Sequence, residues 1–214
     1  MHSRRDPILG LPNFPIAHSR AVARLAYSLA KAIPLPEEQA RAIRNGAYLH
    51  DLGKVAIPPE ILDKPGPLER HEWHVVYEHP AIGTRLSRAL GPLSGCGSLI
   101  LSHHERWDGN GYPNGLKGRQ IPIASQIIAI ADAFHAMTSD RPYRKALSIP
   151  AALQRIRECA GTQWSEEVVM ALMRIVQAHP NQAEAVPGRP RGTDRDQQRF
   201  QKDRAIHRAS PFRR

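Results

Sequence analysis

The chain has 214 residues, of which 41% are hydrophobic, 23% are charged and 6% are aromatic. This length supports one core of ordinary size and is short for two domains. No apolar run reaches the ~20 residues that a membrane span requires, and the first residues lack the apolar segment of a signal peptide. The two cysteines, Cys96 and Cys159, form no CxxC pair, which excludes a disulfide framework and favours a reduced, cytoplasmic location.

The formal net charge of +10 at pH 7 suggests an anionic partner such as a nucleic acid, a nucleotide or an acidic lipid. Much of the excess lies in residues 178–214, which carry eight arginines and one lysine against four acidic residues. This segment has few apolar residues, four prolines and no helical period, so its composition predicts a solvated, disordered basic tail. The alternative is that the tail captures nucleic acid or a membrane surface, and nucleic acid is otherwise not an expected partner.

Helical periodicity dominates the chain from Ala17 to Gln177. The first predicted helix begins near His18, which shares an apolar face with Val22 and Leu25 at spacings of three and four. The further predicted helices run from Pro36 to His50, from Glu69 to Leu90 with a pause at His79-Pro80, from Ser94 to Glu105, from Ile123 to Met137, from Pro150 to Cys159 and from Ser165 to Val176.

Two segments interrupt the helices. Residues 51–70 hold two glycines and four prolines, and residues 106–122 hold four glycines and two prolines, so both are predicted to be loops with short turns. No segment shows the alternation of a strand. The sequence therefore predicts an all-α fold with a single helical-bundle domain at residues 18–177, a short N-terminal segment at 1–17 and a tail at 178–214.

Histidines and aspartates recur at positions that successive helices could bring together. Each doublet alone is weak, because pairs such as His-His and His-Asp occur by chance in a chain of this composition. The separation between them, however, is about one helix plus its connection, so several helices could deliver ligands to one pocket. The sequence thus predicts a shared metal site built from His50, Asp51, His79, His103, His104 and Asp132.

Imidazole nitrogens and carboxylate oxygens suit first-row metals such as Fe, Mn, Ni, Co or Zn, and the absence of cysteine ligands argues against a structural zinc. This many ligands requires two ions. Asp51, which follows a histidine, is the natural bridge; Asp132 can complete one ion, while His79, His103 and His104 hold the other. Taken one at a time, each of these residues has the alternative interpretation of a hydrogen-bonded core or surface group.

Four stretches of the chain resemble the HD-GYP domain, a subgroup of the HD phosphohydrolase superfamily. The resemblance covers residues 18 to about 177, and DGNGYP at 108–113 carries the GYP signature itself. It implies an all-helical HD-type bundle with a long GYP loop and a metal-dependent phosphodiesterase activity on the bacterial second messenger cyclic di-GMP. The stretches are HDLGKVAIPPEILDKPGPL from His50, HPAIG from His79, HHERWDGNGYPNGLKG from His103 and IADAFHAMTSDRPYRKAL from Ile130.

The resemblance also implies that the predicted histidines and aspartates hold a two-metal centre, commonly of iron or manganese. His18, within AHSRAVARLA, looks like the first histidine of the superfamily and is expected on the ion held by His50, Asp51 and Asp132. Some members hold a third metal through a glutamate four residues before this histidine, where this chain has Phe14. A binuclear site is therefore expected.

A hydroxide that bridges two cations is the expected nucleophile, because metal charge lowers the pKa of bound water. The resemblance implies the linear dinucleotide pGpG as first product, with further cleavage to GMP in some members. Asp51 and Lys54 are the expected catalytic residues. Lys54 can balance phosphate charge or protonate the leaving oxygen; the alternatives are a surface lysine and a structural counter-charge.

Two further groups are expected to bind substrate. Arg141 and Lys145 lie four residues apart and can grip a phosphate, although a basic segment facing solvent is the alternative. Gly111, Tyr112 and Pro113 are expected to shape the pocket wall or to contact a partner, because glycine permits close backbone approach and a packed tyrosine ring can still form a hydrogen bond through its hydroxyl.

Two departures from the family pattern affect these expectations. His135, three residues after Asp132, stands where the family usually has aspartate, so we expect it to adjust metal affinity, to add a ligand or to weaken contacts with phosphate. Such domains commonly follow a receiver or sensor domain, whereas only residues 1–17 precede His18; a separate sensor or receiver protein then regulates the chain, or the chain is a fragment. The alternative functions are hydrolysis of another nucleotide and a signalling module that binds a diguanylate cyclase.

Overall fold

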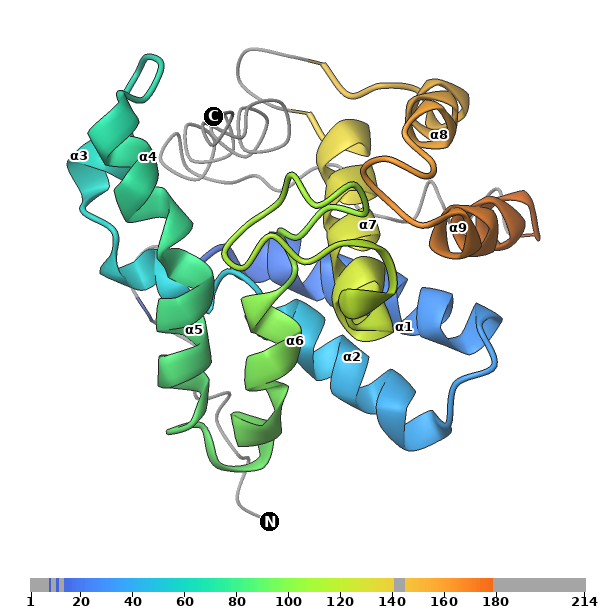
Figure 1. Ribbon diagram of the computed structural model, residues 1–214, viewed down its shortest axis with the longest axis horizontal. Coiled ribbons are helices and arrows are strands. Elements are labelled where there is room, and N and C mark those ends of the chain that lie inside the picture. Colours follow the sequence, from blue (N-terminus) through green and yellow to red (C-terminus); the bar gives the residue numbers. More distant parts are fainter. Residues whose placement is uncertain (1–7, 9–10, 12–13, 141–144, 179–214) are drawn as a thin grey trace.

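A computed structural model describes residues 8, 11, 14–140 and 145–178, and in this part of the chain the predicted all-α fold is confirmed. The described residues form no strand, apart from one isolated bridge between Ala160 and Trp164. Figure 1 shows the arrangement of the helices. The helices are α1 (Ile16–Ala32), α2 (Glu37–Leu49), α3 (Pro59–Leu62), α4 (Arg70–Tyr77), α5 (His79–Ser87), α6 (Gly97–Leu101), α7 (Ile123–Thr138), α8 (Ile149–Glu158) and α9 (Glu166–Ala178), with short 3₁₀ helices η1 (Leu52–Ala56), η2 (Gly91–Cys96) and η3 (Gly118–Gln120).

The main apolar core lies where α1 packs against α2, α7 and α9. The apolar face predicted for the first helix points into this core, with Val22 and Leu29 fully buried. α7 is buried on almost every side from Ala124 to His135, which makes it the central helix of this half (Figure 1). Each large side chain removed from water here contributes roughly 1.5–3 kcal/mol, so the core holds α1 and α7 side by side.

A second half of the molecule is built from α5, α6, η1 and η2. η1 and α5 approach each other closely at two glycines: a Cβ on Gly53 would lie 1.9 Å from the carbonyl oxygen of His79 and 2.6 Å from the backbone nitrogen of Gly83. Only glycine permits this contact between backbones. The contact brings the turn that follows α2 against the first residue of α5.

The prediction of one helix from Ser94 to Glu105 is wrong. The chain there forms η2 and then α6, which ends at Leu101, so that His103 and His104 lie in a turn. Neighbouring residues on a helix point about 100° apart, and a turn is needed for two consecutive side chains to face one site. The predicted pause near His79 is confirmed, because α4 ends at Tyr77 and α5 begins at His79.

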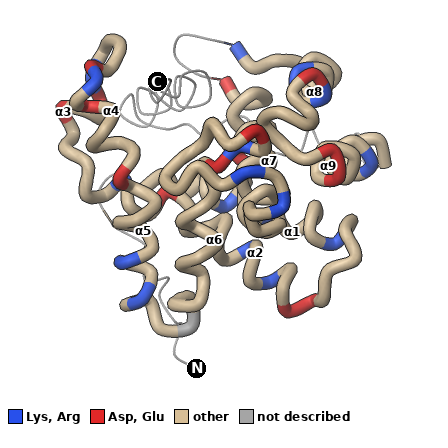
Figure 2. Tube along the Cα trace, in the orientation of Figure 1, with Lys and Arg blue, Asp and Glu red and all other residues tan. Residues whose placement is uncertain are grey.

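Both signs of charge are distributed along the described helices (Figure 2). None of these helices combines the length and the apolar content that crossing a membrane would require. The predicted basic tail at residues 178–214 lies outside the described residues except for Ala178, which ends α9, and Arg141 lies outside them as well.

Candidate metal centre

The structure brings the predicted ligands together between the two halves of the molecule. They come from α1, from the end of α2, from the start of α5, from the turn after α6 and from α7. All of them are buried, although each is a polar or ionisable side chain that is costly to remove from water without a partner. These residues are His18, His50, Asp51, His79, His103, His104 and Asp132.

Three of the histidines are held in the same way. In His50, His79 and His103 the Nδ1 atom donates a hydrogen bond to the backbone carbonyl three residues earlier, at 2.7, 2.7 and 2.5 Å respectively. Because a carbonyl can only accept, the ring proton must lie on Nδ1, and in the neutral ring Nε2 carries a lone pair. Backbone contacts of this kind fix the orientation and tautomer of histidines that bind metals.

The Nε2 atoms of these rings converge without hydrogen-bonding one another. The Nε2 atoms of His79 and His103 lie 3.4 Å apart, and with both ring protons on Nδ1 this contact joins two lone pairs. The Nε2 atom of His50 is also buried and makes no hydrogen bond. A cation among these atoms would satisfy them, so the residues present fit a metal centre.

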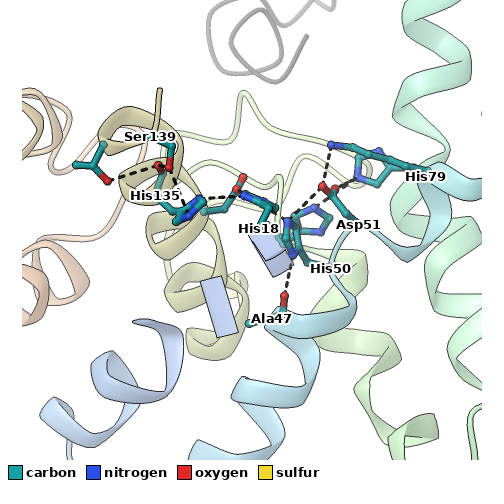
Figure 3. Close-up of polar contacts among 11 residues, drawn as sticks. His18, Ala47, His50, Asp51, His79, His135 and Ser139 are labelled. Carbon is teal, nitrogen blue, oxygen red and sulfur yellow. Dashed lines mark hydrogen bonds and ion pairs between the residues drawn. The ribbon is translucent and has the colours of Figure 1, made fainter. Parts of the chain in front are cut away.

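The carboxylate of Asp51 faces both sides of the centre (Figure 3). Its Oδ2 atom lies 3.4 Å from Nε2 of His50, and its Oδ1 atom lies 3.7 Å from Nε2 of His79. Asp51 therefore belongs to both groups of ligand atoms that lie within 4.8 Å of one another. One group is His18, His50 and Asp51, and the other is Asp51, His79, His103 and His104.

Asp132 of α7 lies beside the first of these groups. Its Oδ1 atom is 3.1 Å from Nε2 of His18 and 3.9 Å from Nε2 of His50. The carboxylate can thus complete the ligand set that His18 and His50 begin, whereas His79, His103 and His104 surround the other side of Asp51. The two groups of potential ligand atoms thus share one carboxylate, that of Asp51.

The ionisation states favour metal binding at neutral pH. Burial, reinforced by neighbouring positive groups, lowers the pKa of His79 to about 4 and that of His103 to about 3. Burial would raise the pKa of Asp51, but the Lys54 ammonium and the rings of His50 and His79 hold it well below its usual range. Neutral imidazole and ionised carboxylate are the forms that coordinate cations.

Lys54 is buried, with 4% of its surface exposed, so the interpretation as a surface lysine is excluded. Its Nζ atom donates a hydrogen bond to Oδ2 of Asp51 at 2.9 Å. The ammonium therefore lies at the edge of the centre, next to the carboxylate that both groups of ligands share.

Tyr112 of the GYP loop forms part of the wall of the centre. Its buried ring stacks on His104, with centroids 4.7 Å apart and an 18° angle between the planes, and it also contacts the ring of Tyr77, with centroids 4.4 Å apart. Gly111 has no room for a side chain, because a Cβ would lie 2.3 Å from the backbone nitrogen of Arg106. Pro113 is exposed. The structure thus explains why position 111 is a glycine and why position 112 carries an aromatic ring.

Sequence reasoning missed Glu105. This buried carboxylate accepts hydrogen bonds from the backbone nitrogens of Asn114 at 2.7 Å and Leu116 at 3.0 Å, and its burial raises its pKa. Because Glu105 directly follows His104, these bonds hold residues 114–116 of the GYP loop next to the histidine pair. The sequence did contain a signal for this role. Glu105 directly follows a histidine pair and precedes a glycine-rich loop, whose backbone N–H groups need acceptors when no regular structure pairs them. Lys145, by contrast, is exposed, and no contact places it in the centre.

A family model described as HD domain matches residues 7–168. A cyclic di-GMP phosphodiesterase of Thermotoga maritima is 42% identical over 160 residues, which are 74% of this chain and 44% of that protein. The cyclic di-GMP phosphodiesterase response regulator RpfG of Xanthomonas campestris pv. campestris is 43% identical over 72% of this chain and 41% of its own length. The 3'3'-cGAMP-specific phosphodiesterase 3 of Vibrio cholerae is 33% identical over 81% of this chain and 38% of its own. The chain spans less than half the length of these relatives.

Solved structures share the fold. A cyclic GMP-AMP-specific phosphodiesterase of V. cholerae, V-cGAP3, superposes with a TM-score of 0.62 at 18% identity, over 87% of this chain and 52% of that one. The HD domain of the L. monocytogenes phosphodiesterase PgpH, solved in complex with cyclic di-AMP, gives a TM-score of 0.58 at 16% identity, over 87% of this chain and 97% of that one.

Proposed function

Since the chain belongs to the HD domain family, we propose that it is a metal-dependent phosphodiesterase that hydrolyses cyclic di-GMP. The observation that carries the proposal is the convergence of buried histidine Nε2 atoms and two aspartates on two adjoining positions, with Asp51 between them. Relatives more than 40% identical are cyclic di-GMP phosphodiesterases, which favours this substrate.

The cofactor that we propose is a pair of divalent ions, of iron or manganese, with nickel, cobalt and zinc as the alternatives that these donors also suit. When bound, such a pair would supply the hydroxide nucleophile expected from the sequence, and it would stabilise the charge on the phosphate oxygens. The ligands of one ion are His18, His50, Asp51 and Asp132, and those of the other are Asp51, His79, His103 and His104.

The protein's own groups have three tasks in this scheme. Asp51 links the two ligand sets, and the backbone bonds to the Nδ1 atoms fix the orientation and the tautomer of the imidazoles. Lys54, already paired with Asp51, is positioned to balance the phosphate charge or to protonate the leaving oxygen. Burial of the whole set strengthens these electrostatic interactions, because buried charges are screened less by bulk water than exposed ones.

Substrate contacts are proposed for the GYP loop and the segment after α7. Tyr112, stacked on His104, and its neighbours Gly111 and Pro113 form the wall against which a dinucleotide would lie. Arg141 and Lys145 are proposed to bind a phosphate of the substrate. The first product is then pGpG, which the same centre can cleave further to GMP.

A second candidate is another cyclic dinucleotide as the substrate. The relative that is 33% identical acts on 3'3'-cGAMP, and a neighbour with the same fold was solved with cyclic di-AMP. The metal centre would bind phosphate, which all of these molecules share. Selectivity between them must therefore come from contacts with the bases. Regulation by a diguanylate cyclase or by a separate sensor or receiver protein stays a prediction.

The test is anaerobic turnover by protein reconstituted separately with iron and with manganese, with metal content quantified and products separated by chromatography. Cyclic di-GMP, 3'3'-cGAMP and cyclic di-AMP are compared at equal concentration. We expect pGpG or GMP to form fastest from cyclic di-GMP, and His103→Ala to abolish turnover while the exposed-site control His71→Ala retains it. Faster turnover of another cyclic dinucleotide supports the second candidate, and absence of turnover with two bound ions contradicts both.

A further inference from the structure

We propose that His135 is a positioning residue: it accepts the Nδ1 proton of His18 and thereby presents the Nε2 atom of His18 to the ion that Asp132 also faces. The inference rests on the proposed metal centre. The Nδ1 atoms of the two rings lie 3.0 Å apart, and the rings meet edge to face with centroids 4.9 Å apart. Both side chains are buried, one on α1 and one on α7.

His18 needs such a partner because of its place in its helix. The other three oriented rings bond to carbonyls in the last turns of α2, α4 and α6, where the helix ends before it can supply the i+4 N–H donor for these carbonyls. His18 lies instead in the first turn of α1, and the carbonyl three residues before it, that of Pro15, accepts the helical hydrogen bond of Ser19 at 2.9 Å. A side chain from α7 takes the place of the backbone acceptor.

The neighbouring serine gives the hydrogen bonds a direction. The hydroxyl of Ser139 donates to the backbone carbonyl of His135 at 2.7 Å, so its oxygen is left to accept from Nε2 of His135 at 3.4 Å. With its proton on Nε2, His135 offers a lone pair at Nδ1, and His18 donates its Nδ1 proton there. The lone pair at Nε2 of His18 then points toward Asp132, 3.1 Å away.

This arrangement selects among the roles expected for His135. Both of its ring nitrogens are used, one toward His18 and one toward Ser139, so it acts through His18 and is not itself a ligand (Figure 3). Its effect falls on the ion held by His18, His50 and Asp132, because the second group of ligands makes no use of the α1 histidine.

The test compares two substitutions in the full chain. His135→Phe keeps a ring of similar size but removes the acceptor, whereas His135→Asn retains an acceptor oxygen close to the place of Nδ1. Binding of Mn²⁺ is titrated in each protein, and in zinc-loaded protein the tautomer of His18 is read by ¹⁵N nuclear magnetic resonance. His71→Phe, on an exposed position of α4, is the matched control.

We expect His135→Phe to weaken one of the two Mn²⁺ sites by about 10- to 100-fold and to leave the other unchanged, which is the usual cost of losing such a partner. His135→Asn should restore most of the affinity, and the Nδ1 proton signal of His18 should disappear in His135→Phe alone. Helical circular dichroism should be equal in all variants.

The inference is overturned if His135→Phe binds both ions as the wild type does, or if His135→Asn loses the same ion as His135→Phe, since the residue would then be a ligand or a packing element. A wild-type protein that binds no ion contradicts the proposed function itself, and the two failures are thus distinguished before any variant is compared.

Discussion

Two regions of the molecule are equally buried and are held together for opposite reasons. In the main core, Leu29 of α1 and Phe134 of α7 belong to one apolar cluster, and both are fully removed from water. On the same two helices, His18, about three turns before Leu29, faces Asp132, two residues before Phe134, with exposed fractions of 6% and 5%. The core is stable by itself, because its burial supplies the free energy. The polar centre, in the function proposed above, is completed by cations, because its lone pairs and carboxylates face one another.

This contrast predicts that the two regions respond to different perturbations. Changes in the core should alter the free energy of unfolding whether or not metal is present. Changes in the centre should alter metal binding and turnover while the helices persist. The predictions below test that separation, from the largest expected effect to the smallest.

Removal of the shared carboxylate should have the largest effect. Asp51→Ala is expected to lower turnover by about 10³-fold or more and to reduce the bound metal below two ions per chain, because both ligand groups use this residue. Steady-state kinetics and metal analysis check this result, with the exposed Glu38→Ala as control. Full turnover in Asp51→Ala would remove the basis for a bridged centre.

Truncation of the central aromatic residue should affect stability alone. Phe134→Ala is expected to lower the free energy of unfolding by about 3–5 kcal/mol, through lost burial and the cavity left behind. Urea unfolding with and without Mn²⁺ should show the same loss, and the exposed Met170→Ala should change little. A loss that metal abolishes would mean that the core and the centre are not independent.

The metal-free centre should make stability depend on pH. The pKa of His79 is lowered to about 4 and that of His103 to about 3, against an ordinary value near 6.5. As pH falls from 7 to 4 the unfolded chain binds protons that the folded chain excludes, so the free energy of unfolding should decrease by a few kcal/mol, with the full value present above pH ~6.5.

Thermal melts in chelator at several pH values measure this dependence. His103→Phe should flatten the slope, because it removes one of the two rings, whereas Phe134→Ala should lower the whole curve without changing its slope. Equal slopes in the His103→Phe variant and the wild type would contradict the assignment of the acid sensitivity to the centre.

The smallest effect is expected for the anchor of the GYP loop. Glu105→Gln keeps the shape of the side chain but replaces one of the two carboxylate oxygens that accept hydrogen bonds from the backbone amides of Asn114 and Leu116. We expect the free energy of unfolding to fall by about 1–2 kcal/mol. We expect a higher KM with unchanged metal content, since the loop forms the wall beside His104. The control is Glu166→Gln, which is exposed, and loss of metal in Glu105→Gln would assign that carboxylate to the centre instead.

Local pattern was sufficient where one apolar face decides the structure. α7 begins at the predicted Ile123, and α8 and α9 lie within about two residues of the predicted bounds, because their apolar stripes have no competing demand. The prediction of one helix from Ser94 to Glu105 failed because an apolar stripe is not the only demand on this segment. The adjacent His103 and His104 both face the centre, which consecutive residues of a helix cannot do, and α6 accordingly ends at Leu101.

The ligand types were readable from the sequence, but their contacts were not. The convergence of His18 on Asp132 depends on how α1 packs against α7, which no local spacing specifies. The bond from His135 to His18 joins residues on two helices far apart in the chain, and Glu105 acts through backbone amides that carry no signature in the side-chain pattern. Such contacts become visible only when the helices are in place.

The most direct test of the account is the electron paramagnetic resonance of the wild-type chain titrated with Mn²⁺. Two ions that share Asp51 should bind per chain and give the signal of a spin-coupled pair, which Asp51→Ala should convert to that of isolated ions or abolish. A single uncoupled ion at saturation, or no bound ion, would contradict the claim that two cations complete the buried centre.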